Sequence, residues 1–186
     1  MESIMKNEKI RTLVYIALIA AIICVTAPWA IPNPISPSIP FTLAIFVIAL
    51  FSLIFGAKVS VPATALYIVL GALGVPVFSG FAGGFAKLAG PTGGYIVGFI
   101  GLAFLAGLTA YPKFSAMWKK IPLLIAGLAV AYAFGTVWFM ISTGTGLIPS
   151  LMLCVVPYIP FDLAKLALAL GLSSLVRSRL GKRVKV

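Results

Sequence analysis

Hydrophobic residues run along this chain in long, nearly unbroken segments rather than in the alternating patterns of soluble domains. Six such segments are separated by charged residues and by breaks rich in proline and glycine. About 20 apolar residues suffice for a helix to cross the hydrocarbon core of a bilayer. The pattern therefore predicts an all-α integral membrane protein with six transmembrane helices. The predicted helices are Thr12–Thr26, Phe41–Gly56, Val59–Leu73, Pro91–Tyr111, Ile121–Ser142 and Leu147–Val176.

The last of these segments is longer than one crossing requires and contains Pro157 and Pro160. Proline is best tolerated in the first turn of a helix. We therefore expect a break at the two prolines, with the final crossing starting near Pro160. Because the first N–H groups of a helix lack partners within it, we also expect free backbone N–H groups beside Asp162.

Composition supports a lipid environment. The chain is 62% hydrophobic and only 9% of its residues are charged, whereas soluble domains carry about 25% charged residues. The net charge of +11 does not indicate nucleic-acid binding, because that function needs a solvated basic face. The accumulation of Lys and Arg in short cytoplasmic flanks explains the excess better. We therefore expect one transmembrane domain over residues 1–186, in contact with the bilayer and with no nucleic-acid partner.

The basic residues also predict the orientation in the cell membrane. If the N-terminus is cytoplasmic, 12 of the 14 Lys and Arg residues fall on cytoplasmic flanks, as the positive-inside rule requires. Both termini are then cytoplasmic, as short basic tails over residues 1–11 and 177–186. The irregular segments Ala27–Pro40 and Gly74–Gly90 fall outside. The first carries five prolines and is stiff, so it could cover a cavity. Alternatively, it is a plain connector.

Asp162 is the only acidic residue outside the N-terminal tail, and Lys165 follows three positions later. Residues at this spacing share one face of a helix. Ionisable side chains inside a membrane segment are costly, and they usually face the bundle interior with a functional role. Two interpretations stay open: the pair belongs to a ligand-binding site, or it is a structural ion pair that holds helices together.

Gly90–Tyr95 forms a second candidate site at the start of the fourth predicted helix. Unpaired N–H groups at a helix start attract anions and carbonyl oxygens, and glycines allow close approach to the backbone. Gly94 and Gly98 can instead allow another helix to pack closely, and both roles can hold at once. Ala17 and Ala21 make a similar notch on the first helix, which is a weak signal by itself.

Several classes of function lack their sequence signals. The chain has no His, and its two cysteines lie far apart in apolar segments, so neither a metal site nor a disulfide framework is indicated. Paired acids, a Gly-x-Ser-x-Gly elbow and a phosphate-binding loop are also absent. We therefore expect no catalytic residues, no cofactor and no ATP hydrolysis by this chain.

The motifs, in their order along nearly the whole chain, resemble the BioY family, the biotin-specific S components of energy-coupling factor (ECF) transporters. The matching segments are Tyr67–Phe78, Gly83–Gly84, Leu88, Gly90–Tyr95, Gly98–Phe99, Pro157 and the Asp162–Lys165 pair. Three positions depart from the family's usual residues. Ala44 replaces a glutamine, and Cys154 and Phe161 each replace a glycine.

The resemblance implies a six-helix protein that captures biotin from outside. It further implies a coupling transmembrane protein and two cytoplasmic ATPases as partners, with Ala17 and Ala21 at the docking surface. The implied biotin-binding residues are Thr42, Thr92, Gly93, Gly94, Tyr95, Asp162 and Lys165. Asp162 can accept from the ureido N–H groups, and the Gly93–Tyr95 backbone can receive the carboxylate. The alternatives are a solitary secondary transporter of another small vitamin, and a structural membrane protein in which the Asp162–Lys165 pair only packs helices.

Overall fold

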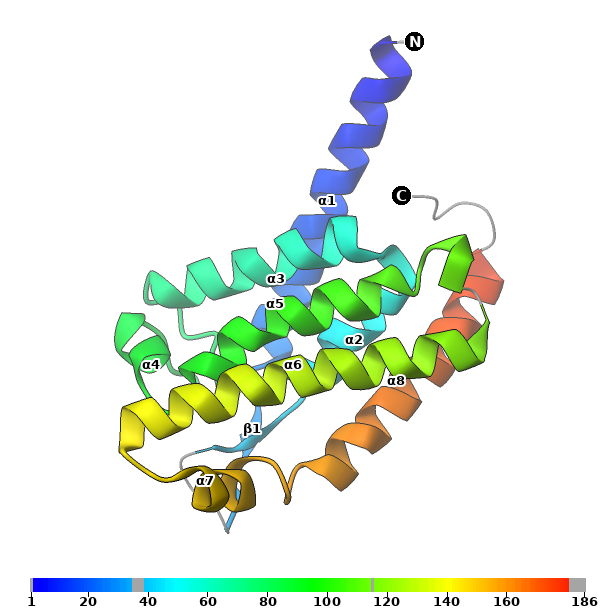
Figure 1. The fold of residues 1–186 in the computed structure, drawn as a ribbon. Helices are drawn as coiled ribbons and strands as arrows, with labels where there is room; N and C mark the ends of the chain where they lie inside the picture. The colour runs from blue at the N-terminus through cyan, green and yellow to red at the C-terminus, as the bar shows by residue number, and fades with distance from the viewer. Residues whose placement is uncertain (1, 35–38, 115, 181–186) are drawn as a thin grey trace.

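The computed structural model describes residues 2–34, 39–114 and 116–180 and shows a helical bundle (Figure 1). This agrees with the predicted all-α fold. The helices are α1 (Glu2–Thr26), α2 (Ala44–Phe55), α3 (Ala57–Ala72), α4 (Phe85–Ala89), α5 (Gly93–Leu108), α6 (Met117–Thr143), α7 (Leu147–Cys154) and α8 (Ile159–Leu180). A 3-10 turn, η1 (Pro112–Phe114), precedes α6, and the two short strands β1 (Ala30–Ile31) and β2 (Phe41–Thr42) pair antiparallel.

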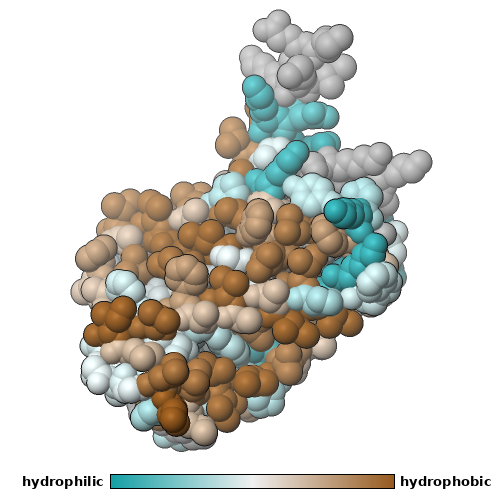
Figure 2. Space-filling model, viewed as in Figure 1, coloured by the Kyte–Doolittle hydropathy of each residue, from teal (hydrophilic) through white to brown (hydrophobic). Residues whose placement is uncertain are grey.

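Three of the described helices are long and apolar enough to cross a membrane. They are Asn7–Thr26 within α1, all of α6, and Ile159–Arg179 within α8. Helices α2, α3 and α5 are apolar but shorter. At 1.5 Å per residue, the 12 residues of α2 extend about 18 Å, less than the roughly 30 Å hydrocarbon core. Helix length thus supports three crossings directly, and six crossings stay a prediction. Figure 2 shows the broad apolar surface expected of a chain that faces lipid.

The helix boundaries depart from the predicted ones where local pairing competes with the helix. The second helix begins at Ala44 rather than Phe41, because Phe41 and Thr42 pair with β1. The fifth begins earlier, at Met117, and accommodates Pro122 near its start. Helix α1 reaches back to Glu2, so the residues predicted as an N-terminal tail continue the first helix.

The predicted break in the last segment is present, between α7 and α8. The expectation of free N–H groups beside Asp162 is wrong for Tyr158, Ile159 and Asp162 itself, whereas no described backbone hydrogen bond satisfies the N–H group of Phe161. The N–H groups of Tyr158 and Ile159 donate to the carbonyl oxygen of Val155 at 2.9 and 3.2 Å, and that of Asp162 donates to Tyr158 O at 2.8 Å. The turn between the two helices supplies the acceptors that the start of an isolated helix would lack.

Helix α5 lies at the centre and packs against α6, α3 and α2 (Figure 1). Its glycines allow the close approach to α6. A Cβ atom on Gly94 would lie 2.3 Å from Trp138 Cβ, and one on Gly98 would lie 2.9 Å from Ala131 Cα. Small residues that let two backbones approach are typical of helix contacts in membranes. The packing interpretation of Gly94 and Gly98 is therefore confirmed.

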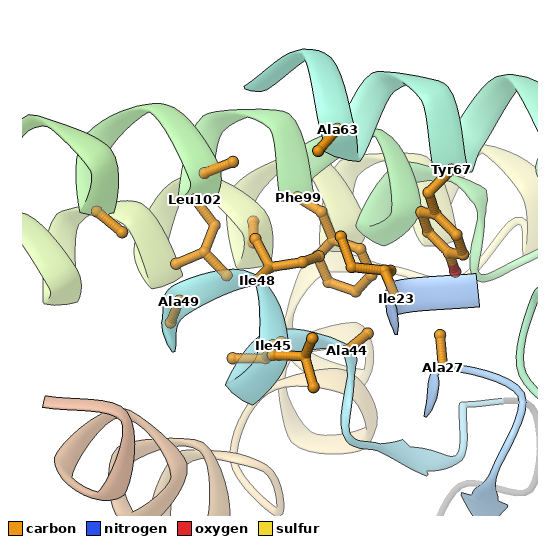
Figure 3. Close-up of a cluster of buried hydrophobic side chains, with 14 of the residues drawn as sticks. Ile23, Ala27, Ala44, Ile45, Ile48, Ala49, Ala63, Tyr67, Phe99 and Leu102 are labelled. Carbon is orange, nitrogen blue, oxygen red and sulfur yellow. The ribbon is translucent and has the colours of Figure 1, made fainter. Parts of the chain in front are cut away.

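The main core joins α1, α2, α3 and α5 (Figure 3), and α6 and α8 also contribute buried residues to it. Tyr67 of α3 points into it and meets the ring of Phe78 edge-on, with the centroids 5.5 Å apart. The Phe78 ring in turn lies over Gly71, where an added Cβ would be 2.1 Å from it. The Tyr67–Phe78 motif thus fixes the connection after α3 against the core. This core supports the inner wall of the cavity described next.

Candidate ligand-binding site

A cavity lies at the end of the bundle where α1 ends and where α2, α5 and α8 begin. Its wall is mainly apolar and aromatic, with a few polar side chains, as is usual for sites that bind small molecules. The lining residues are Ala27, Ile39, Pro40, Thr42, Ala44, Ile45, Tyr67, Ser79, Thr92, Tyr95, Ile96, Phe99, Tyr132, Cys154, Tyr158, Asp162 and Lys165.

Asp162 is held from two helices. Lys165 Nζ, one turn later on α8, lies 2.8 Å from Asp162 Oδ1. The hydroxyl of Tyr132, from the middle of α6, donates to Asp162 Oδ2 at 2.8 Å. Asp162 is only 1% exposed. Burial of a carboxylate is costly unless its oxygens are paired, and here both have a partner.

This arrangement bears on the two interpretations of the ion pair. The pair lies within α8, so it does not itself join two helices; the link from α8 to α6 runs through Tyr132. All three side chains also line the cavity. Each carboxylate oxygen has lone pairs for more than one donor. Asp162 can therefore keep both present partners and still accept hydrogen bonds from a ligand.

Thr92 lines the same cavity and carries an unpaired polar atom. It is 7% exposed, directly precedes α5, and makes no capping bond with its side chain. Its Oγ1 is buried without a hydrogen-bond partner in the described structure. A buried hydroxyl left unsatisfied costs about 1–3 kcal/mol. A polar group of a ligand that entered the cavity would remove this cost.

Tyr95 is placed by packing and by one hydrogen bond. Its ring lies against Gly135 of α6, where an added Cβ would be 2.3 Å from the ring. Its hydroxyl donates to the carbonyl oxygen of Cys154 at 3.2 Å, at the end of α7. Tyr95 thereby joins α5, α6 and α7 around one side of the cavity.

The structure brings together five of the seven residues that sequence reasoning proposed for the site. Thr42, Thr92, Tyr95, Asp162 and Lys165 all line the cavity. Gly93 and Gly94 are not among the lining residues. Gly93 faces α4, where an added Cβ would lie 1.6 Å from the carbonyl oxygen of Leu88, and Gly94 faces α6. Both glycines act by packing the start of α5.

Tyr158 and Asn33 are functional candidates that sequence reasoning missed. The Tyr158 hydroxyl donates to the carbonyl oxygen of Ile39 and accepts from Asn33 Nδ2 at 2.7 Å. Tyr158 and Asn33 are 5% and 2% exposed. The bonds fasten the segment between α1 and α2 to the break before α8. The only signal in the sequence was the position of Tyr158 between the two prolines of that break.

The segment expected to cover the cavity contributes to its wall. Ala27, Ile39 and Pro40 line it, and the β1–β2 pairing brings Thr42 beside Ala30. Residues 35–38, in the middle of the expected cover, lie outside the described residues. A second, more open groove adjoins the cavity and shares Thr42 and Lys165 with it. The remaining residues of that groove are Trp29, Ala30, Ile31, Pro32, Pro34, Phe41, Leu43 and Phe161.

Ala17 and Ala21 lie away from the cavity. Both are exposed and one turn apart on α1, beside the exposed apolar side chains of Leu13, Val14 and Leu18. The notch is therefore on the outside of the bundle, where another helix can reach it. Its use for docking stays a prediction.

Comparisons of the sequence and of the structure with known proteins point to the same family. The family model described as the BioY family matches residues 1–182. The biotin transporter BioY of Thermotoga maritima is 40% identical over 159 residues, covering 86% of this chain and 91% of the relative. The probable biotin transporter BioY of Pyrococcus horikoshii is 37% identical over 157 residues, covering 83% and 90%.

A solved structure shows the same fold. The crystal structure of the S-component for biotin from an ECF-type ABC transporter superposes with a TM-score of 0.82 at 27% identity, and the match covers 92% of this chain and 93% of that one. Of the three departures from the family's usual residues, Ala44 and Cys154 line the cavity, and Phe161 lines the adjoining groove. The matched family model, the relatives and the shared fold establish that this chain is a multi-pass membrane protein that belongs to the BioY family.

Proposed function

We propose that this chain is the biotin-binding subunit of an ATP-driven vitamin uptake transporter of the ECF type. The observation that carries the proposal is the buried Asp162, held by Lys165 and Tyr132, in the wall of a largely apolar cavity. The family membership and the biotin named for the relatives support the choice of ligand. The chain itself acts as a transport subunit rather than as an enzyme.

The groups in the cavity suit the chemistry of biotin. The ureido ring offers two N–H donors and one carbonyl acceptor, and Asp162 accepts from the donors. Hydrogen bonds to a charged partner contribute about 1.5–3 kcal/mol each. Lys165 donates to a ligand oxygen or keeps Asp162 in its charged form. The apolar bicycle and chain of biotin pack against side chains such as Ile45, Ile96 and Phe99.

Thr92 and Tyr95 complete the proposed site on the α5 side. The unpaired Thr92 hydroxyl is a donor for the biotin carboxylate or for another ligand oxygen, and Thr42 faces the cavity from the opposite connection. Gly93 and Gly94 support this side indirectly, because their lack of side chains sets where α5 starts against α6.

For transport, we propose that both termini are cytoplasmic and that the cavity opens toward the outer face of the cell membrane. Twelve of the 14 basic residues then lie on the cytoplasmic side. The chain has no ATP-binding motif, so the energy for uptake comes from two partner ATPases through a coupling transmembrane protein. The exposed Ala17–Ala21 notch of α1 is the proposed docking surface for that protein.

The proposal is tested by titrating the purified protein in detergent with biotin and, in parallel, with riboflavin and thiamine. Heat measured by calorimetry should show saturable binding of one biotin per chain and no saturable binding of the other two vitamins. Binding of riboflavin or thiamine in place of biotin would contradict the assigned ligand. Absence of binding by all three would contradict the assigned function.

A further inference from the structure

One end of the bundle, opposite the cavity, concentrates positive charge. Helices α2, α5 and α8 end there, and α6 begins there. In Figure 2 the hydrophilic residues on the visible face gather toward this end. We call the set of basic side chains at this end, on α6, α8, η1 and the first turn of α3, the basic patch. Its members are Lys58, Lys113, Lys119, Lys120, Arg177 and Arg179.

The basic patch lacks acidic neighbours among the side chains that the structure describes. Of those side chains, only Glu8 and Asp162 are acidic, and the one salt bridge among them joins Asp162 to Lys165. Asp162 and Arg177 are 15 residues apart on α8, which at 1.5 Å per residue separates them by about 22 Å. Asp162 is therefore too far away to neutralise the patch, and among the described side chains no salt bridge joins Glu8 to it.

Two of its cations, Lys120 and Arg177, are partly buried, and their charges act on each other. Arg177 donates from Nη2 to the carbonyl oxygens of Ile54 at 3.2 Å and Ala110 at 3.3 Å, which ties the end of α8 to the ends of α2 and α5. Lys120 lies near enough to Arg177 for the two positive charges to repel. An anion between them would turn this repulsion into attraction, because its interaction with both cations is favourable.

Aromatic and apolar side chains adjoin the charges. Trp118 is 71% exposed, and Lys119 Nζ lies 5.1 Å from the centre of its ring. Lys119 also donates to the carbonyl oxygen of Lys113 at 3.4 Å. The neighbours Met117 and Ile121 are 52% and 44% exposed. Cations beside exposed apolar groups match a ligand that carries an anionic head and hydrocarbon tails.

We propose that the basic patch binds the headgroup of an anionic phospholipid, with the phosphate near Lys120 and Arg177 and with Trp118 at the boundary with the acyl chains. Both α6 and α8 are long enough to cross a bilayer, so their ends lie at the level of the headgroups. Basic clusters between helices at this level attract anionic lipids, and Trp is enriched there. The proposal does not depend on the ligand of the cavity.

The test uses the fluorescence of Trp118 as a local probe of lipid composition. Trp29 and Trp138 are replaced by Phe, and the protein is reconstituted in vesicles of phosphatidylglycerol and phosphatidylcholine at equal mole fraction. Either the first or the second lipid carries brominated chains, which quench nearby tryptophan. We expect stronger quenching by brominated phosphatidylglycerol, with local enrichment of about fivefold for each contacting cation.

The double substitution Lys119→Gln and Lys120→Gln removes two of the six cations and should reduce the difference in quenching between the two lipids. Lys87→Gln, a matched change on α4 away from the basic patch, should leave the difference intact. If the protein without Trp29 and Trp138 does not fold, the same signal is obtained as the difference between wild type and Trp118→Phe. Equal quenching by the two lipids when the patch is intact would overturn the proposal. An acidic protein partner would then be the next candidate for the basic patch.

Discussion

Tyr158 holds the connection between α1 and α2 through its hydroxyl group and through its ring. It donates to the carbonyl oxygen of Ile39 and accepts from Asn33 Nδ2, while its ring meets Phe41 with the centroids 4.7 Å apart. All three partners belong to the connection between α1 and α2. Tyr158 therefore sets how firmly this connection stays over the cavity.

We predict that Tyr158→Phe speeds the release of biotin with little effect on folding. The ring and its apolar contacts remain, but two hydrogen bonds are lost. At about 1 kcal/mol for each bond, the dissociation rate should rise by roughly tenfold or more. The measurement is release of radiolabelled biotin from the purified protein after dilution. Tyr111→Phe, at the far end of the bundle, is the matched control, and equal release rates in the two variants would contradict this role.

At the scale of the elements, the apolar segments predicted the helices well because helices in lipid must satisfy their own backbone groups. The exceptions have local causes. The β1–β2 pairing joins Ala30 to Thr42 and Ile31 to Phe41. Strands of only two residues are too short to show an alternating hydrophobic pattern in the sequence. The short helix α4, Phe85–Ala89, lies within a glycine-rich connection where only the tertiary packing decides the conformation.

The site was predictable only in part. Asp162 and Lys165 stood out because charge is rare in membrane segments. Tyr132 did not, since a tyrosine in an apolar helix looks like any core residue until α6 is placed beside α8. For Gly94, the sequence permitted both a ligand contact and a helix contact, and the distance from an added Cβ to Trp138 identifies the helix contact.

The close contact between α5 and α6 depends on glycine at position 98, so a larger residue there should destabilise the protein. Gly98→Ala would place Cβ 2.9 Å from the backbone Cα of Ala131, which cannot rotate away. Overpacking of this kind costs about 1–3 kcal/mol, so the thermal unfolding midpoint in detergent should fall.

Gly171→Ala is the matched control for this substitution. Gly171 lies within α8, and an added Cβ there would have no atom within 4 Å. Because alanine favours the helix over glycine by about 1 kcal/mol, the control should not fall below the wild type. Equal midpoints for the two variants would show that α5 and α6 do not pack as closely as described.

At the scale of the whole molecule, the regions proposed for binding and for docking are separate. The cavity lies at the start of α8, and the exposed Ala17 and Ala21 lie on α1. We predict that replacing both alanines by Trp abolishes biotin uptake by cells that express the complete transporter, while biotin binding by the purified subunit stays within about twofold. Bulky side chains prevent the close approach that small residues allow.

The control carries the same two-residue change on another lipid-facing helix. Ala126 and Ala129 are exposed on α6, and Trp at both positions should leave uptake and binding intact. A loss of binding in the Ala17 and Ala21 variant would place the notch inside the bundle. Unchanged uptake would contradict its role in docking.

The central claim is that Asp162 holds biotin in this cavity, and one pair of titrations tests it most directly. Wild type and Asp162→Asn are purified in detergent and titrated with biotin by calorimetry, with Glu8→Gln, an acid-to-amide change on α1, as the matched control. Asparagine fits the space but removes the charge proposed to accept the ureido N–H groups, and it replaces one carboxylate oxygen by an NH2 donor. The loss of about 2 kcal/mol or more predicts that biotin binds Asp162→Asn at least tenfold more weakly. Glu8→Gln should bind like the wild type. Equal affinity of folded Asp162→Asn and wild type would contradict the account.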